Sequence, residues 1–173
     1  IEKALDLLRS NSALKAEKKS SRVAADGILV TCVTNTYSTI VEINSETDFA
    51  AKDSNFLSFA NEVKDFISNN KVSEIDFINN SDIEDSRKAL VQTIGENIQI
   101  RRVSTIEFEA GTNVGLYLHS DSKLGAIVTL QGGNKEIAKD IAMHVAAFNP
   151  LCLSEEDLDE ETLNREKAIY ENQ

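Results

Sequence analysis

The order in which β-rich runs and amphipathic runs follow one another is the feature that most constrains the fold. Two β-rich runs, GILVTCVT at 27–34 and YSTIVEIN at 37–44, flank the short polar link Asn35-Thr36. β-Branched residues suit a half-buried pleated surface and a short polar link suits a turn, so an antiparallel hairpin is predicted. A second hairpin is predicted from VGLYLHS at 114–120 and KLGAIVTLQ at 123–131. A further strand is expected at 97–109, with a bulge or bend near Arg101-Arg102 where its alternation shifts.

Helical periodicity occupies the stretches around these strands. Residues 1–25 are expected to be helical, with a break and a new N-cap at Ser10-Asn11-Ser12, and 71–80 to be a loop, either without helix or with one helical turn. A left-handed Gly95 is expected to close the helix at 82–95, and Ser154 with Asp157 resembles a capping box before an acidic helix near 160–171. The inward positions are predicted to be Phe56, Phe59, Ala60, Val63, Phe66 and Ile67 in a helix at 54–70; Ile83, Ala89, Leu90 and Ile94 in the helix at 82–95; and Ile137, Ile141, Ala142, Val145 and Ala146 in a helix at 136–148.

Hairpins with segregated helices indicate an α+β fold, not a parallel α/β sheet. The predicted architecture is two subdomains of antiparallel strands with segregated helices, preceded by an N-terminal helix. The chain opens on Ile1 within a helical pattern, so it is expected to begin inside an element, and any targeting peptide would lie outside it.

Composition limits the classes of partner. The net charge of −11 disfavours nonspecific binding to nucleic acid, which needs lysine and arginine to neutralise phosphates. The charge is uneven, because residues 1–22 are net positive and residues 154–173 carry eight acids and two bases. There is no apolar run near 18 residues, so no membrane span is expected.

Motifs for covalent chemistry are missing from the sequence. It contains no Gly-rich phosphate loop, G-x-S-x-G elbow, HExxH motif or EF-hand loop. Cys32 and Cys152 lie far apart, and His119 and His144 are not at metal-ligand spacing to them, so no metal or cofactor is expected. The residues alone therefore indicate a soluble binding module without a visible active site. Phe49, at the tip of the connection that follows the strand predicted at 37–44, is either a core residue or a probe for another molecule.

Four segments carry a resemblance to a known family. They are RVAADG at 22–27, INSETDFAAKDSNF at 43–56, IGENIQIRRV at 94–103 and IAMHVAAFNP at 141–150. In this order they resemble the elongation factor Ts family over residues 15–150. The resemblance implies that residues 1–20 are the end of a helical N-terminal domain and its linker, that 21–110 form the first core subdomain, and that 111–173 begin the second and end in an acidic helical tail. It also implies that the sequence is a fragment.

The resemblance implies a guanine nucleotide exchange factor, not an enzyme, which promotes GDP release from elongation factor Tu during translation. Thr47-Asp48-Phe49 would enter the partner near its magnesium and phosphate site, with Phe49 as a wedge. Ile94, Gly95, Glu96 and Asn97 would be a neighbouring contact segment, and His119 would press on the same region. Ala50 stands where the family more often has valine, which should alter packing at the rim more than the mechanism.

Alternatives remain open at this point. The chain could bind Tu as a scaffold without promoting exchange, or it could be a small-molecule enzyme that uses His119. The family match further implies the cytoplasm or an organelle of bacterial descent, no direct contact with nucleic acid or membrane, and a homodimer, if one forms, through regions outside this sequence.

Overall fold

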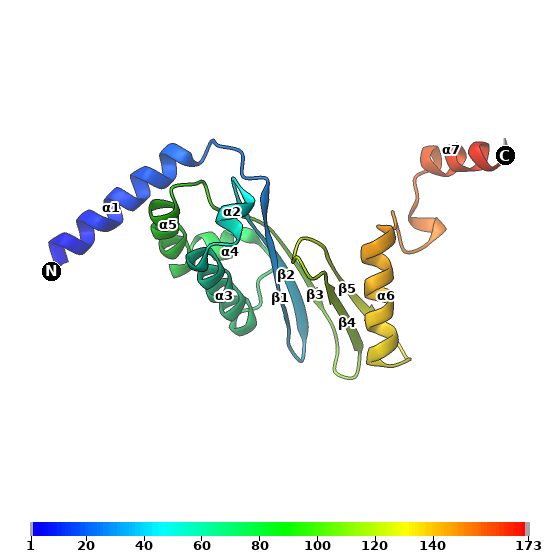
Figure 1. Cartoon of the computed structure of the whole chain (residues 1–173). Helices are drawn as coiled ribbons and strands as arrows, with labels where there is room; N and C mark the ends of the chain where they lie inside the picture. The colour runs from blue at the N-terminus through cyan, green and yellow to red at the C-terminus, as the bar shows by residue number, and fades with distance from the viewer. Residues whose placement is uncertain (1, 172–173) are drawn as a thin grey trace.

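The computed structural model describes residues 2–171, apart from the side chains at 2, 4–6, 8, 9 and 155. It is an α+β fold with two antiparallel sheets, as predicted. Figure 1 shows the elements in layers. Helices α2–α5 lie on one side of the first sheet, and its other side faces the second sheet and α6. The elements are α1 (Glu2–Lys19), β1 (Asp26–Val33), β2 (Tyr37–Ser45), α2 (Asp48–Ala51), α3 (Ser54–Asn69), α4 (Ile75–Asn79), α5 (Asp82–Ile94), β3 (Gln99–Glu107), β4 (Asn113–Leu118), β5 (Gly125–Leu130), α6 (Lys135–Phe148), a 3-10 turn (Glu155–Asp157) and α7 (Glu160–Glu171).

The first sheet has the order β1-β2-β3, and both strand pairs are antiparallel. The predicted hairpin at Asn35-Thr36 is confirmed. The predicted bulge is confirmed too: Arg102 pairs with Glu42 and Ile100 pairs with Ile43, so Arg101 is the extra residue. In a regular strand, residues 100 and 103 would face opposite sides of the sheet. The extra residue puts the buried Ile100 and the half-buried Val103 on the same side, where both contribute to the main core.

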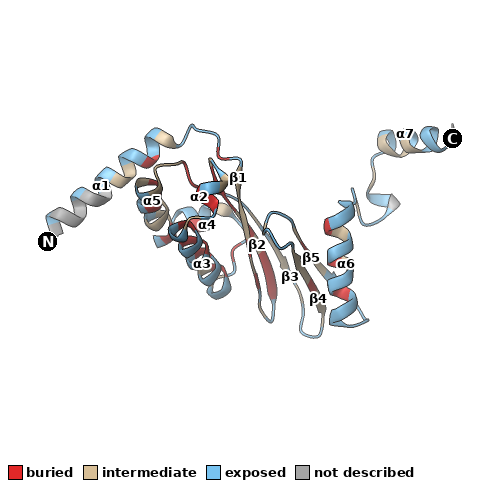
Figure 2. Cartoon of the chain, in the orientation of Figure 1, coloured by how far each residue is buried: buried red, intermediate tan, exposed pale blue. Residues whose placement is uncertain are grey.

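Helix α3 packs on β1 and on α5, and the main core lies between these two helices and the sheet (Figure 2). Helix α3 follows a side-chain cap in which Asp53 accepts from the amide of Asn55, and its predicted apolar face is buried except for the half-buried Phe66. Gly95 ends α5 with φ of 87°, as predicted. The cluster reaches from Ala16 in α1 to Ile100 in β3.

The second sheet, β4-β5, lies against α6. The approach is so close that a Cβ atom added at Gly115 in β4 would lie 1.9 Å from the carbonyl oxygen of Ala138 in α6. Ala138 and Ala142 are therefore the fully buried positions of the helix, because only small side chains fit beside the strand. The prediction that Ile137 faces inward is wrong, since this side chain is exposed.

Helix α7 and the 3-10 turn extend away from the layers (Figure 1), and no residue described in α7 is buried. The helix predicted near 160–171 is confirmed. The predicted capping box is confirmed in part. Asp157 accepts from the amide of Ser154 at 3.1 Å, but the pair encloses the 3-10 turn, whereas Asp159 caps α7 by accepting from the amide of Thr162 at 2.7 Å. Within the described residues, no helix combines the length and apolar character needed to cross a bilayer.

The first helix differs from its prediction at two places. Helix α1 runs unbroken through Ser10-Asn11-Ser12, because Ser12 does not cap a new helix but donates from Oγ to Gln92 Oε1 in α5 at 2.6 Å. It also ends at Lys19, whereas the prediction extended to residue 25. The chain leaves the helix where Asn97 Nδ2 donates to the carbonyl oxygen of Arg22 at 2.7 Å, a contact from 75 residues away. Three apolar residues that give the start of this stretch its helical pattern, Ala4, Leu5 and Leu8, lie outside the described side chains.

Two details of the middle region were also wrong or incomplete. The region 71–80 contains the five-residue helix α4, which agrees with the prediction of a loop with one turn, but the sequence did not indicate that its Ile78 would be fully buried. In α5, Ala89 was expected to face inward but is exposed, and Val91, which was not predicted, is buried in the core instead. The chain passes from the first sheet to the second between Glu107 and Asn113. The division into 1–20, 21–110 and 111–173 stays a prediction.

Candidate interaction site at the α2 tip

The Thr47-Asp48-Phe49 segment forms the start of α2, directly after strand β2. Thr47 is the N-cap residue, and its Oγ1 accepts from the amide of Ala50 at 3.3 Å. Ala50 and Ala51 are buried against the body of the protein, whereas the ring of Phe49 is 81% exposed. The tip therefore has a buried side that anchors it and an outer side that presents an aromatic ring to solvent.

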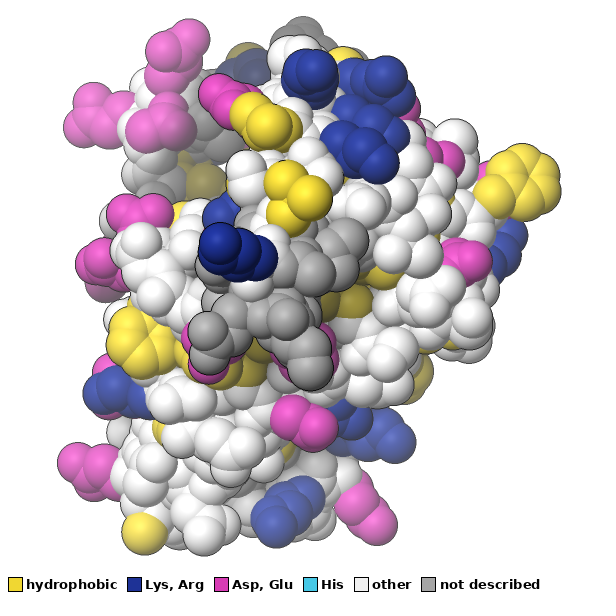
Figure 3. Space-filling view, turned by 90° about the vertical axis from the view of Figure 1, so that its left-hand side faces the viewer, with side chains coloured by type: hydrophobic (Ala, Val, Ile, Leu, Met, Phe, Trp, Pro, Cys, Tyr) yellow, Lys and Arg dark blue, Asp and Glu magenta, His cyan; other side chains and the backbone are white. Residues whose placement is uncertain are grey.

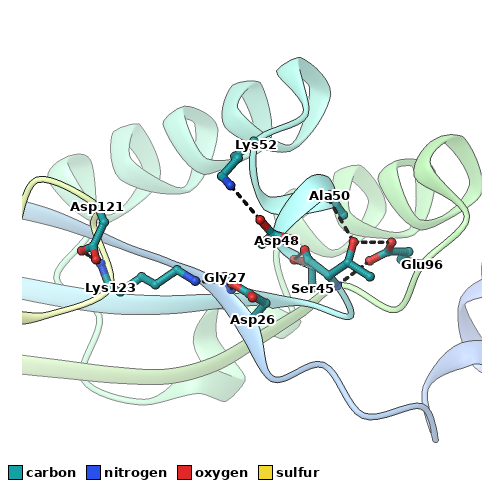
Figure 4. Close-up of polar contacts among 10 residues, drawn as sticks. Asp26, Gly27, Ser45, Asp48, Ala50, Lys52, Glu96, Asp121 and Lys123 are labelled. Atoms are coloured by element: carbon teal, nitrogen blue, oxygen red, sulfur yellow. Dashed lines mark hydrogen bonds and ion pairs between the residues drawn. The ribbon is translucent and has the colours of Figure 1, made fainter.

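Glu96 fixes the backbone beneath this ring. Its carboxylate accepts from the amide of Thr47 at 3.0 Å and from Thr47 Oγ1 at 2.7 Å, as Figure 4 shows. Ser45 Oγ donates to the carbonyl oxygen of Thr47 at 2.9 Å. The N-terminus of a four-residue helix is thus held by three side-chain hydrogen bonds in addition to its own cap.

A second set of contacts links the same region to the end of α1. Glu46 Oε1 accepts from the amide of Asn97 at 2.6 Å and lies 3.5 Å from Arg22 Nη1. Lys19 Nζ donates to the carbonyl oxygen of Gly95. Asn97 is fully buried, so its side chain acts inside the protein, and a direct contact with a partner would require it to move. The structure thus shows that Glu96 and Asn97 hold residues 46 and 47 at the base of the tip.

Asp48 has a partner at the opposite end of α2, in the C-cap residue Lys52. Its Oδ2 atom lies 2.7 Å from Lys52 Nζ in an i,i+4 ion pair, and both side chains are partly exposed. Figure 4 shows Lys52 pointing back toward the carboxylate. Any partner that engages Asp48 therefore meets a carboxylate that already has a counter-ion.

His119 lies at the end of β4, at the start of the loop to β5. It is exposed, and its Nδ1 atom lies 2.8 Å from the hydroxyl oxygen of Tyr117. The following residues, 120–123, form one side of a groove of about 420 Å³. Asp48, Ala51 and Lys52 of the α2 region form the opposite side. The loop that carries His119 and the tip that carries Phe49 are therefore the two sides of one groove.

Asp26 and Lys123 form an ion pair at the floor of this groove, with 2.6 Å between Asp26 Oδ1 and Lys123 Nζ. The hydrogen bond from Lys123, together with one from the amide of Gly27, holds the pKa of Asp26 below its usual value. The hydrogen bond to Asp26 raises the pKa of Lys123 in turn. The two shifts widen the pH range over which both groups of the pair are charged.

Sequence reasoning missed Lys52, Asp26 and Lys123. The i,i+4 spacing of Asp48 and Lys52 was a signal that could have been used. Asp26 and Lys123 are 97 residues apart, and nothing local in the sequence links them. Neither histidine is enclosed: His144 is exposed on α6 and stacks on Phe148 with 4.4 Å between ring centroids. Within the described residues, no group of three or more histidine, cysteine, aspartate or glutamate side chains is placed to hold a metal ion.

Comparison with known proteins decides the family. The family model for Elongation factor TS matches residues 46–173, which include the α2 tip, residues 94–97 and His119. The chain belongs to the elongation factor Ts family. Elongation factor Ts of Hahella chejuensis is 45% identical over 175 residues, and that of Teredinibacter turnerae is 46% identical over 176, each alignment covering 100% of this chain. Elongation factor Ts of Pseudoalteromonas atlantica is 44% identical over 174 residues and covers 98% of it.

The chain spans about 60% of the length of these curated relatives. Members of the elongation factor Ts family therefore carry further sequence that is not part of this structure. Figure 3 shows the side of the molecule on which α1 lies, where dark blue lysine and arginine side chains gather toward the top. Lys15 and Lys18 in the last turns of α1 and Arg22 after it are exposed. The region leading to the tip is thus basic, whereas α7 is acidic.

Proposed function

We propose that this chain acts as a guanine nucleotide exchange factor that promotes GDP release from elongation factor Tu in translation elongation. The observation that carries the proposal is the ring of Phe49, which is 81% exposed on a helix whose backbone is clamped by Glu96. Membership of the elongation factor Ts family supports it. Exchange in this proposal is non-covalent, and Thr47, Asp48, Phe49 and His119 are the residues that contact the partner.

Linkage explains how a wedge could promote release. If the factor binds nucleotide-free Tu more tightly than GDP-bound Tu, then GDP must bind the factor complex more weakly by the same ratio. A coupling of ~4 kcal/mol corresponds to roughly a thousandfold weakening. Burial of one phenylalanine contributes about 1.5–3 kcal/mol. Phe49 is therefore too small to act alone, and the loop of His119 on the other side of the groove is the second contact that we propose.

Stopped-flow release of a fluorescent GDP analogue from Tu tests the proposal. The unaltered chain should accelerate release, and Phe49→Ala should reduce the acceleration by roughly tenfold to hundredfold, which corresponds to the loss of one buried phenylalanine. The melting temperature should stay nearly unchanged because the ring is exposed in the free protein.

Phe148→Ala is the matched control, because Phe148 is another exposed ring, 72% accessible, at the end of α6 in the layer beyond the second sheet. It should leave release unchanged. Binding to Tu without acceleration by the unaltered chain would favour the scaffold, and turnover of a small molecule without Tu would favour the enzyme. A large fall in melting temperature for Phe49→Ala with exchange intact would show that Phe49 is a structural residue.

A further inference from the structure

The loop between β4 and β5 is an internally bonded unit. The amide of His119 donates to the carbonyl oxygen of Leu124 at 2.8 Å, and the amide of Ser122 donates to the carbonyl oxygen of His119 at 2.8 Å. Asp121 Oδ1 accepts from the amide of Lys123 at 2.9 Å. These bonds fix the shape of the loop, so His119 moves only when the loop moves as a whole.

The loop is attached to the free edge of β1 by two polar contacts. The amide of Leu29 donates to the carbonyl oxygen of Ser122 at 2.6 Å, which satisfies an edge amide that β2 does not use. Three residues away, the ion pair joins Lys123 to Asp26 at 2.6 Å. Figure 4 shows Lys123 extended along β1 toward Asp26. One backbone contact and one side-chain contact therefore hold the loop against the strand.

The same strand forms the floor of the groove whose other side is α2. Gly27 and Ile28 of β1 line the groove together with Asp48 and Lys52 from the α2 region. The attachment of the loop to β1 therefore sets how far the loop lies from α2. A loop released from β1 would leave the tip intact but would change the width of the groove.

We infer that Asp26 and Lys123 are positioning residues: their ion pair latches the β4-β5 loop to β1, so that His119 and Phe49 are held at the spacing at which both engage one partner. This inference rests on the proposed function, and it adds two residues to the site. Exposed ion pairs contribute little to stability, and Lys123 is half exposed, so breaking the pair leaves the fold intact. The effect of the latch should therefore be seen in the loop and in exchange, not in the melting temperature.

The first experiment measures the latch in the free protein by hydrogen exchange of single amides. In Lys123→Met, the Leu29 amide that donates to Ser122 should exchange about threefold to fivefold faster, which is within what an exposed ion pair contributes. Lys123→Arg should restore protection because it keeps the charge and a donor for Asp26. Lys71→Met is the matched control, since Lys71 forms an exposed ion pair with Glu107 at 3.0 Å at the other end of the sheet. Unchanged exchange at Leu29 in Lys123→Met would overturn the latch.

The second experiment measures GDP release from Tu in a double-mutant cycle. Lys123→Met should slow the accelerated release about fivefold in the unaltered background and in Phe49→Ala. It should have no effect in His119→Ala, because the latch acts through the loop that carries this histidine. Lys123→Arg should restore the rate in the unaltered background.

The two ways to fail are distinct. If the unaltered chain does not accelerate release, the proposed function is wrong and the positioning role falls with it, whatever the amides show. If the unaltered chain accelerates release but Lys123→Met slows it equally in the His119→Ala background, the proposed function stands and Lys123 is not a positioning residue for His119. Full acceleration by Lys123→Met would have the same meaning.

Discussion

Phe49 projects from the protein because side chains far away in the sequence fix the backbone beneath it. Glu96, 49 residues downstream, holds both the amide and the hydroxyl group of Thr47. Periodicity could not have revealed this exposure, since phenylalanines are mostly buried. The expectation that the ring faces outward came from the resemblance of the TDF segment to the elongation factor Ts family, and the structure confirms the exposure. The contact with a partner stays a prediction.

Glu96 should control the order of the tip. Glu96→Ala removes both acceptors from Thr47 and should destabilise the protein by about 1 kcal/mol, the usual contribution of a hydrogen bond. That loss corresponds to a fall of about 2–4 °C in melting temperature. Glu96→Gln keeps an amide oxygen for the Thr47 amide and a donor for the hydroxyl oxygen, so it should cost less. Thermal unfolding and exchange of the Phe49 and Ala50 amides measure the two effects.

Glu107→Ala is the control for the loss of a partly exposed glutamate, because Glu107 forms an exposed ion pair with Lys71 at 3.0 Å and lies away from the tip. It should leave the exchange of the Phe49 and Ala50 amides unchanged. Equal behaviour of Glu96→Ala and Glu96→Gln would show that the clamp does not order the tip.

Helix boundaries could be predicted from the sequence where the apolar residues lie on one side of the helix and a capping residue marks its start. Helix α3 was predicted within one residue because one side of it is strongly apolar and Asp53 caps it. Helix α6 was placed equally well, but the wrong residue was expected inside. Ile137 and Ala138 are neighbours in a stretch with apolar residues on several sides, and Gly115 on the facing strand decides between them. A facing residue 23 positions away cannot be read from helical periodicity.

Gly115 should be the most sensitive position of the second sheet. In Gly115→Ala the new methyl group would overlap the carbonyl oxygen of Ala138, so α6 must shift away from β4. Overpacking of this kind costs about 1–3 kcal/mol, or roughly 2–12 °C in melting temperature. Calorimetry measures the loss. Gly125→Ala is the matched control, since Gly125 lies in the facing strand, also without a positive φ, and a Cβ atom there would lie 3.1 Å from its nearest neighbour. An equal or greater loss for Gly125→Ala would contradict the close-approach argument.

The stacking of the two sheets could not be predicted from the sequence. The hairpin-then-helix plan of each half was visible, but the contacts that join the halves link residues such as Asp26 and Lys123, which share no local pattern. The buried surface is also unequal. The main cluster extends from α1 to β3, whereas the residues of α6 that are buried are three alanines, Ala138, Ala142 and Ala146.

Hydrogen exchange of the whole molecule should therefore fall into three levels. Amides of β2 and α3 around Val41 and Val63 should be the slowest, because they open only when the main core opens. Amides of α6 around Ala142 should exchange faster, and those of α7 should be almost unprotected, because no residue described there is buried. Mass spectrometry of exchanged peptides measures the levels. Equal protection of α3 and α6 would instead show that the layers open as one cooperative unit.

Arg101, the extra residue of the bulge, shifts the alternation of inward and outward side chains along strand β3 by one position. Ile98 and Ile100 reach the core from even positions, and beyond the extra residue Val103 and Thr105 occupy the corresponding side from odd positions. Since side chains alternate between the two faces of a strand, one residue more or less inverts everything on one side of it. Deletion of Arg101 would therefore exchange the inward and outward side chains of half of the strand, although Arg101 and Arg102 themselves are exposed and form ion pairs with Glu42. An exposed residue thus determines which side chains of β3 face the core.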